Sequence, residues 1–451
     1  MAARQITDEE WEQKGSEVRA HYSSLTLHRK CAQAWYYRYD LGLSRDIEEV
    51  AAPERDFGSW FGALTAAEAL ERGRKYGSLK GKPGKFRSVD GIEKFDMATV
   101  TTQDVFEAAQ SWWEQQQPEA MEEWEERLGE GLMDRLPEAY ESWYEEHAEA
   151  RKYERPIAVE LFWERALPRP KNDADWDPET GQINVNLIGF IDELYEDTQR
   201  GLIVVRDRKT SKQLSSQSAV DDMMDSQLAL YGWGAAPMIS SWGLPAPRAL
   251  AYDRVKSAKP TQPKLTTSGR LSATNKLFDL RSYRKFINEN TVPEELPDNF
   301  SNLLPWQQNM IRGMQERGGR FWGEWGAFYV SGKNKGDPKF GIYLEEESVL
   351  ERISTPAHKS IFHQRTLVPL SPHVVRAHLR AAVDTATDIH RTQRRAELTQ
   401  EAARDFTGSN CRWCDFASLC RAQMIGGPQG EYELAEHKLK QRDGLRVIGQ
   451  S

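Results

Sequence analysis

Two aspartates and a lysine lie near the middle of the chain, on two segments that have the pattern of neighbouring strands. The segment INVNLIGFIDELY carries Asp192, and the segment GLIVVRDRKT carries Asp207 and Lys209. The short stretch EDTQRG separates them, which predicts an antiparallel hairpin. Because strand side chains alternate between faces, we expect Asp192 and Asp207 to lie diagonally near each other, within roughly 7–8 Å.

Carboxylates and a lysine on a face that should be buried need partners, because an unpaired buried charge is costly. Hard carboxylate oxygens suit Mg²⁺ or Mn²⁺ better than a soft metal. Lys209 would then lie beside the metal, where it can orient an attacking water or offset negative charge on a phosphate. The Asp-x-Lys pattern alone is weak, since a structural ion pair explains it equally well.

Four cysteines form a second candidate site. Cys411, Cys414 and Cys420 lie close together in NCRWCDFASLC, whereas Cys31 lies near the other end of the 451 residues, in LHRKCAQAWYYRY. No apolar run has the length of a membrane span, and the start of the chain does not resemble a signal peptide, so we expect a cytoplasmic protein with no membrane partner. Disulfides are unstable in a reducing compartment, so the clustered cysteines indicate metal binding.

The surrounding pattern predicts strands between helical segments. We expect strands over 157–167, 183–195 and 201–210, and helices over 57–74, around 226–236 and over 374–397. Residues 7–43 are expected to be largely helical. A glutamate-rich stretch over 101–154 carries tryptophans at helical spacing, which favours solvated helices.

Charge is unevenly distributed along this acidic chain. The net charge of −9 does not suggest a nucleic-acid binder, but residues 248–285 are strongly basic. Local charge matters more to a polyanion than the total does. We therefore predict that this stretch contacts DNA through Lys256, Lys259 and Lys264, called the loop lysines below; a purely solvated loop is the alternative.

The motifs GFID, VVRDRKT and QLALY, in this order, resemble the nuclease motifs of the RecB-like branch of the PD-(D/E)XK superfamily. The nearest resemblance is to the CRISPR-associated exonuclease family and its phage-encoded homologues. This resemblance implies that Asp192 and Asp207 hold the Mg²⁺ or Mn²⁺ ion and that Lys209 is catalytic. It also implies that Gln227 and Tyr231, one helical turn apart, face the same site.

The cysteine segments resemble those of the iron–sulfur members of the family, which bind a [4Fe–4S] cluster with one cysteine before the nuclease core and three after it. The resemblance assigns this cluster to Cys31, Cys411, Cys414 and Cys420, so that it closes a loop of nearly the whole chain. A four-cysteine zinc site and unconnected core cysteines are the alternatives.

One motif departs from the family pattern. A metal-binding histidine is usual in a helix that corresponds here to GSWFGALTAAEAL, and Gly62 takes its place. Glu160, in AVELFWERAL, is a candidate for the missing ligand, with an ordinary strand glutamate as the alternative. Glu68 and Glu71 are weaker candidates, and His28 is interpreted as a packed or surface histidine.

We therefore expect an α/β protein with a PD-(D/E)XK restriction-endonuclease-like core, in which helices flank a central mixed sheet. The expected parts are a helical N-terminal region with the acidic insertion (1–155), the nuclease core (156–240), an insertion with the basic loop (241–373), and a C-terminal helix with the cysteine staple (374–451).

The expected function is a metal-dependent DNA exonuclease in viral recombination or DNA processing, with a recombination protein as a candidate partner, in the cytoplasm of a bacterial host. An inactive DNA-end-binding or adaptor protein on the same fold is the main alternative, and a zinc-stapled scaffold that recruits partners through its tryptophan-rich helices is a weaker one.

Overall fold

The computed structural model describes residues 17–45, 53–81, 95–167, 184–214, 222, 225–261, 279, 281–283, 301, 305, 308–309, 312, 320–328, 338–343, 354–359, 361–399, 401–405, 408–412, 414–425 and 439–441.

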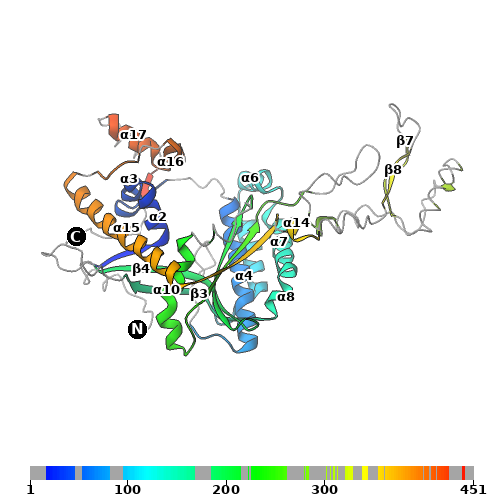
Figure 1. Ribbon diagram of the computed structural model, residues 1–451. Helices are drawn as coiled ribbons and strands as arrows, with labels where there is room; N and C mark the ends of the chain where they lie inside the picture. Colours follow the sequence, from blue (N-terminus) through cyan, green and yellow to red (C-terminus); the bar gives the residue numbers. More distant parts are fainter. Residues whose placement is uncertain are drawn as a thin grey trace.

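A mixed six-stranded sheet lies at the centre of the fold (Figure 1). Its strands are β1 (Glu17–His21), β3 (Glu154–Ala166), β4 (Asn184–Asp197), β5 (Leu202–Ser211), β6 (Ala249–Lys256) and β9 (His363–Pro369). The order is β1-β4-β5-β6-β9, and β3 also pairs with β4. The β1–β4 and β5–β6 pairs are parallel and the others are antiparallel, so the predicted mixed sheet is confirmed.

The register of β4 leaves part of one edge open. β3 pairs with residues 186–197 of β4 along one edge. On the other edge β5 pairs with residues 193–197 and β1 with residues 184–188. Residues 189–192 therefore lie between two partners on that edge, with Asp192 at the point where β5 leaves the pairing.

The predicted hairpin between β4 and β5 forms as expected from its turn residues. The side chain of Asp197 accepts hydrogen bonds from the backbone N–H groups of Gln199 and Arg200, both at 3.0 Å. Gly201 follows with a φ of +66°, a conformation that glycine adopts at little cost. This turn fixes the register in which Glu193 lies opposite Arg206.

Helices cover both faces of the sheet (Figure 1). The alanine-rich helix α4 (Pro53–Tyr76) packs on one face, where it contacts β3, β4 and β5. The acidic insertion adds α5 (Thr102–Glu114), α6 (Pro118–Leu128), α7 (Leu132–Glu146) and α8 (Ala148–Arg151) around it. Trp124 and Trp143 of this insertion are fully buried in the core that α4 forms, so these tryptophans pack inside the protein rather than on a recruiting surface.

The other face carries α10 (Ser226–Ser241) and, beside it, segments from both ends of the chain. These are α2 (Tyr22–Lys30), α3 (Ala32–Trp35), the π-helical turn η1 (Tyr36–Asp40) and the long helix α15 (Pro372–Thr399). They share one large core with α10 and the strands. The short helices α16 (Gly408–Arg412) and α17 (Ala417–Ile425) lie beside α2 and α3 (Figure 1).

Hydrogen bonds join these two terminal segments. The backbone N–H of Gln33 donates to Ala403 O at 2.9 Å, and the hydroxyl of Tyr37 donates to Gln423. Tyr37 also packs on Phe416, with 5.5 Å between ring centroids. The remaining elements are β2 (Leu43–Arg45), which pairs with β10 (Leu439–Gln441), the hairpin of β7 (Arg320–Phe328) and β8 (Pro338–Tyr343), and α14 (Pro356–Lys359). Among the described helices, none combines the length and the apolar character that crossing a bilayer requires.

The sheet includes segments that the sequence did not place in it. Residues 22–40 are largely helical, as expected, but residues 17–21 form a strand that pairs with β4. The strands β1, β6 and β9 of this sheet lie outside residues 156–240. At residues 17–21, pairing with a distant strand overrides the local helix propensity.

A network of buried charges lies between α4 and the sheet. Arg206 is fully buried and makes ion pairs with Glu154 and with Glu193, the latter at 2.9 Å. Arg72 of α4 approaches the same two carboxylates, at 3.4 and 3.1 Å. Burial opposes ionisation of Glu154, but Arg206 and Arg365 lower its pKa to about 2. The network therefore keeps these charges ionised inside the protein.

Candidate active site

The two predicted aspartates meet where β4 and β5 separate. The last residue pair of the hairpin is Glu193 with Arg206, so Asp192 and Asp207 are the next residues on each strand. They lie directly beyond this pair rather than in the diagonal arrangement that the sequence suggested. One oxygen of Asp192 accepts a hydrogen bond of 2.7 Å from the backbone N–H of Arg208, which holds the Asp192 carboxylate against β5.

Both aspartates are buried enough for their charges to interact strongly. Burial, and then the negative charge of Asp207, raises the pKa of Asp192 to about 7. Burial also raises the pKa of Asp207, whose side chain is almost inaccessible. Two carboxylates in such a place favour a positive charge between them, as a bound cation or an ammonium group provides.

Lys209 supplies that charge in this structure. Its Nζ lies 2.9 Å from Oδ2 of Asp207, and 43% of its side chain stays exposed. Burial of the ammonium opposes protonation, but the ion pair with Asp207 raises the pKa of Lys209, so the lysine is cationic. It lies at the boundary between the buried carboxylate and solvent, where a substrate phosphate can reach it.

The two residues on α10 face this ion pair. Oε1 of Gln227 accepts a hydrogen bond of 3.0 Å from Lys209 Nζ. Its Nε2 donates to Asp207 Oδ1 at 3.2 Å and lies 3.3 Å from the hydroxyl of Tyr231. Gln227 therefore holds the carboxylate and the ammonium together, and Tyr231 supports Gln227 one turn further along the helix.

Glu160 lies opposite Asp192 on the neighbouring strand. β3 and β4 pair Val159 with Glu193 and Leu161 with Ile191, so Glu160 and Asp192 occupy the intermediate position. Among the described residues, Glu160 alone combines a side chain with a positive φ, of +48°. A left-handed backbone costs a non-glycine residue about 1–2 kcal/mol and is often found at functional sites.

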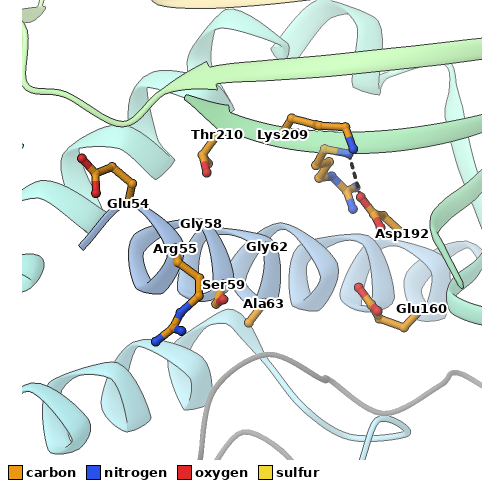
Figure 2. A pocket seen from close by; sticks show the side chains of 11 residues that line it. Glu54, Arg55, Gly58, Ser59, Gly62, Ala63, Glu160, Asp192, Lys209 and Thr210 are labelled. Atoms are coloured by element: carbon orange, nitrogen blue, oxygen red, sulfur yellow. Dashed lines mark hydrogen bonds between the residues drawn. The ribbon is translucent and has the colours of Figure 1, made fainter. Parts of the chain in front are cut away.

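A pocket of about 490 Å³ opens between α4 and these strands (Figure 2). Glu160, Asp192 and Lys209 line one part of it, and Gly58, Ser59, Gly62 and Ala63 of α4 line another. A Cβ atom added to Gly62 would meet no atom within 4 Å, whereas one on Gly58 would lie 2.6 Å from Thr210 Oγ1. The position of the missing histidine therefore faces the pocket and has room for a side chain.

The other acidic residues of α4 and His28 lie elsewhere. Glu68 makes buried ion pairs with Arg72 and Arg151. Glu71 accepts a hydrogen bond from Thr102. His28 is bonded to Thr392 at 3.0 Å and packs against Trp35, as expected for a structural histidine.

The acidic side chains at the pocket are candidate ligands for a metal ion. In the ranges given above, no three His, Cys, Asp or Glu side chains are arranged to hold one metal ion. The three carboxylates nevertheless come from adjacent positions on β3, β4 and β5, and their hard oxygens match Mg²⁺ or Mn²⁺. The donor set fits such an ion chemically, while Lys209 neutralises Asp207 in the arrangement observed here.

The four cysteines are unpaired thiols, each half-buried. Cys31 caps the end of α2, and the side chain of Asn410 donates to the backbone oxygen of its neighbour Lys30 at 3.3 Å. Burial raises the pKa of Cys414, and the nearby Cys31 and Cys411 raise it further. The fold thus brings the N-terminal cysteine to the C-terminal three, although not around a single ion. A [4Fe–4S] cluster has one iron for each of four cysteines, so its ligands need not share one ion.

Two of the three loop lysines have partners within the protein. Lys259 forms an ion pair with Glu130, and Lys256 lies over the ring of Phe362, with Nζ 5.3 Å from the centroid. Lys264 lies outside the described residues.

The pocket is also lined by Arg208, Thr210 and Ser59, which the sequence analysis did not identify. The sequence offered one indication of their role, which is that Arg208 and Thr210 are the neighbours of Lys209.

The comparison with known families decides what this geometry belongs to. A profile of the PD-(D/E)XK nuclease superfamily matches residues 20–421. The chain belongs to this superfamily. The match covers all of the sheet except the start of β1, together with the pocket and the segments that carry all four cysteines, and it confirms the restriction-endonuclease-like α/β core. No curated protein matches the chain significantly. Members of the superfamily are nucleases, so DNA cleavage is the activity that the fold implies.

Proposed function

We propose that the protein is a metal-dependent DNA exonuclease whose active site consists of Asp192, Asp207, Lys209 and Glu160. The observation that carries this proposal is a pair of neighbouring buried carboxylates, Asp192 and Asp207, of which Asp207 forms an ion pair with the half-exposed Lys209 beside a pocket, in a chain of the PD-(D/E)XK superfamily. Mg²⁺ or Mn²⁺ bound to the carboxylates would lower the pKa of a water and offset charge on the phosphate.

In this proposal each side chain has a separate task. Asp192 and Asp207 hold the cation, and Glu160 adds a carboxylate from the facing strand, in place of the histidine that Gly62 cannot supply. Lys209 acts on the scissile phosphate, either by orienting the attacking water or by stabilising the charge of the transition state. Gln227 and Tyr231 keep Lys209 in place through the hydrogen bonds described above.

We also propose that Cys31, Cys411, Cys414 and Cys420 bind a [4Fe–4S] cluster with a structural role. Reduced thiols from the two ends of the chain approach one another, and hydrogen bonds already join their segments. A cluster at this place would close a loop of nearly the whole chain and so stabilise the packing of α2 against the C-terminal helices. Four-cysteine zinc binding is the competing assignment.

We propose that the loop lysines guide the DNA strand toward the pocket. The biological setting that we propose for this activity is viral DNA recombination or processing. Lysines that neutralise phosphates release counterions, so their contribution should depend on salt. Lys256 is the last residue of β6, and Lys259 and Lys264 follow it in the chain between β6 and β9.

A DNA-end-binding adaptor is the second candidate, and a specific observation favours it. Position 62 carries no side chain that could bind a metal, and among the described residues no three His, Cys, Asp or Glu side chains are arranged to hold one ion.

The test that separates the two functions is an assay with end-labelled linear DNA and covalently closed circles, single- and double-stranded, with Mg²⁺ or Mn²⁺. An exonuclease degrades the linear molecules and spares the circles. Binding of DNA ends without cleavage under any metal would favour the adaptor.

A further inference from the structure

A hydroxyl group from the N-terminal part of the chain reaches the beginning of α10. Tyr22 is the first residue of α2, and its hydroxyl donates a hydrogen bond of 2.9 Å to Oδ1 of Asp225. The same oxygen accepts a hydrogen bond of 2.9 Å from the backbone N–H of Gln227, because Asp225 is the N-cap of α10. One carboxylate oxygen therefore joins α2 to the first turn of the helix that faces the active site.

The residue held by this cap is the one that contacts the ion pair of the site. Gln227 accepts a hydrogen bond from Lys209 and donates one to Asp207. Both contacts depend on the placement of the first turn of α10, since Gln227 is only two residues after the cap. A shift of this turn by a fraction of an ångström would change the distance from Gln227 to Lys209.

We propose that Tyr22 is a positioning residue, which fixes Asp225 and, through the first turn of α10, sets Gln227 against Lys209. This inference rests on the proposed nuclease function of the site. Tyr22 acts through the carboxylate of Asp225, the helix cap, and not through Asp192, Asp207 or Lys209.

The helix that carries Tyr22 is itself held by the C-terminal part of the chain. Arg29 of α2 donates to Thr385 Oγ1 at 2.7 Å and to Ala381 O at 2.8 Å, both on α15. The same helix ends at Cys31, one of the four cysteines. The contact of Tyr22 with Asp225 thus connects the assembly of the two chain ends with the active site.

The test is Tyr22→Phe in the full-length protein, which removes the hydroxyl and keeps the ring. A hydrogen bond to a charged group contributes enough that its loss should lower kcat about tenfold. KM for DNA should stay unchanged, because no DNA-binding side chain is altered, and the fall in unfolding temperature should be no larger than in Tyr37→Phe, which also loses a hydroxyl hydrogen bond. Tyr37→Phe is the matched control: it also removes a hydroxyl hydrogen bond, to Gln423, in the same terminal assembly, and it should leave kcat unchanged.

Two further measurements make the result specific. In a double-mutant cycle, Tyr22→Phe should have little additional effect on kcat once Gln227→Ala is present, because the hydroxyl acts through that side chain. Amide hydrogen exchange at Gln227 should be faster in Tyr22→Phe than in Tyr37→Phe, whether or not the protein cleaves DNA.

The inference is overturned by unchanged kcat and exchange in Tyr22→Phe, by an equal loss of kcat in Tyr37→Phe, or by additive losses in the cycle. A wild-type protein that cleaves no DNA would contradict the proposed function instead. In that case the exchange rate at Gln227 still decides whether Tyr22 orders the first turn of α10.

Discussion

Replacing Arg206 by methionine should destabilise the protein far more than an exposed arginine would. Arg206 is fully buried between Glu154 and Glu193, and its removal leaves both carboxylates with fewer partners. The fall of the Glu154 pKa from 4.5 to about 2 corresponds to about 3 kcal/mol of favourable interaction, to which Arg206 makes the largest charged contribution. Breaking a buried pair by removing one partner generally costs about 3–5 kcal/mol. We therefore expect Arg206→Met to lower the free energy of unfolding by about 3 kcal/mol.

The assay is urea-induced unfolding followed by tryptophan fluorescence, with the free energy taken from the midpoint and slope. Arg200→Met is the matched control, since Arg200 pairs with Asp197 but 56% of its side chain is exposed, and it should cost less than about 1 kcal/mol.

The effect of Arg206→Met should also depend on pH. The contribution of a carboxyl group whose pKa is lowered by folding is present above its unfolded value of 4.5 and is lost as pH falls toward about 2. The difference between wild type and Arg206→Met should therefore shrink over this range. Equal costs for the Arg206 and Arg200 variants at pH 7 would refute the view that the buried network stabilises the fold.

Three more outcomes follow from the proposed sites. Anaerobically purified protein should contain about four irons per chain, and Cys31→Ser should lose as much iron and stability as Cys414→Ser; stoichiometric zinc without iron would contradict the cluster. Changing the three loop lysines to glutamine should weaken DNA binding and flatten its dependence on salt, whereas an unchanged slope would mean that these lysines are only solvated. Gly62→His should tighten Mn²⁺ binding measured by calorimetry, because a side chain there faces open space in the pocket, and an unchanged affinity would show that position 62 does not reach the metal.

The sequence predicted those parts of the fold and of the site that depend on residues close together in the chain. The hairpin followed from two alternating apolar runs and a turn, and its prediction placed Asp192, Asp207 and Lys209 on adjacent strands, as observed. The helix that carries Gln227 and Tyr231 was likewise expected; Gln227 contacts the ion pair, and Tyr231 contacts Gln227. These features depend on residues within a few positions of one another, so periodicity can reveal them.

What the sequence did not reveal depends on contacts between distant segments. The strand at 17–21 pairs with β4 more than 160 residues later, and only this pairing, together with that of β5, leaves the edge at Asp192 open. The bond from Tyr22 to Asp225 spans 203 residues and carries no local pattern. The pairing of Lys259 with Glu130 is similar, since a charge run does not indicate which acid will lie beside it.

The most direct test of the central proposal compares three substitutions in one cleavage and binding assay on end-labelled linear DNA. Asp192→Ala and Asp207→Ala should abolish cleavage and weaken Mn²⁺ binding, because each removes a ligand and leaves the other carboxylate with an under-coordinated cation. Lys209→Ala should abolish cleavage while Mn²⁺ and DNA affinities stay close to wild type, because the lysine acts on the transition state. If Asp207→Ala cleaves as well as wild type, the active site does not lie at the end of this hairpin.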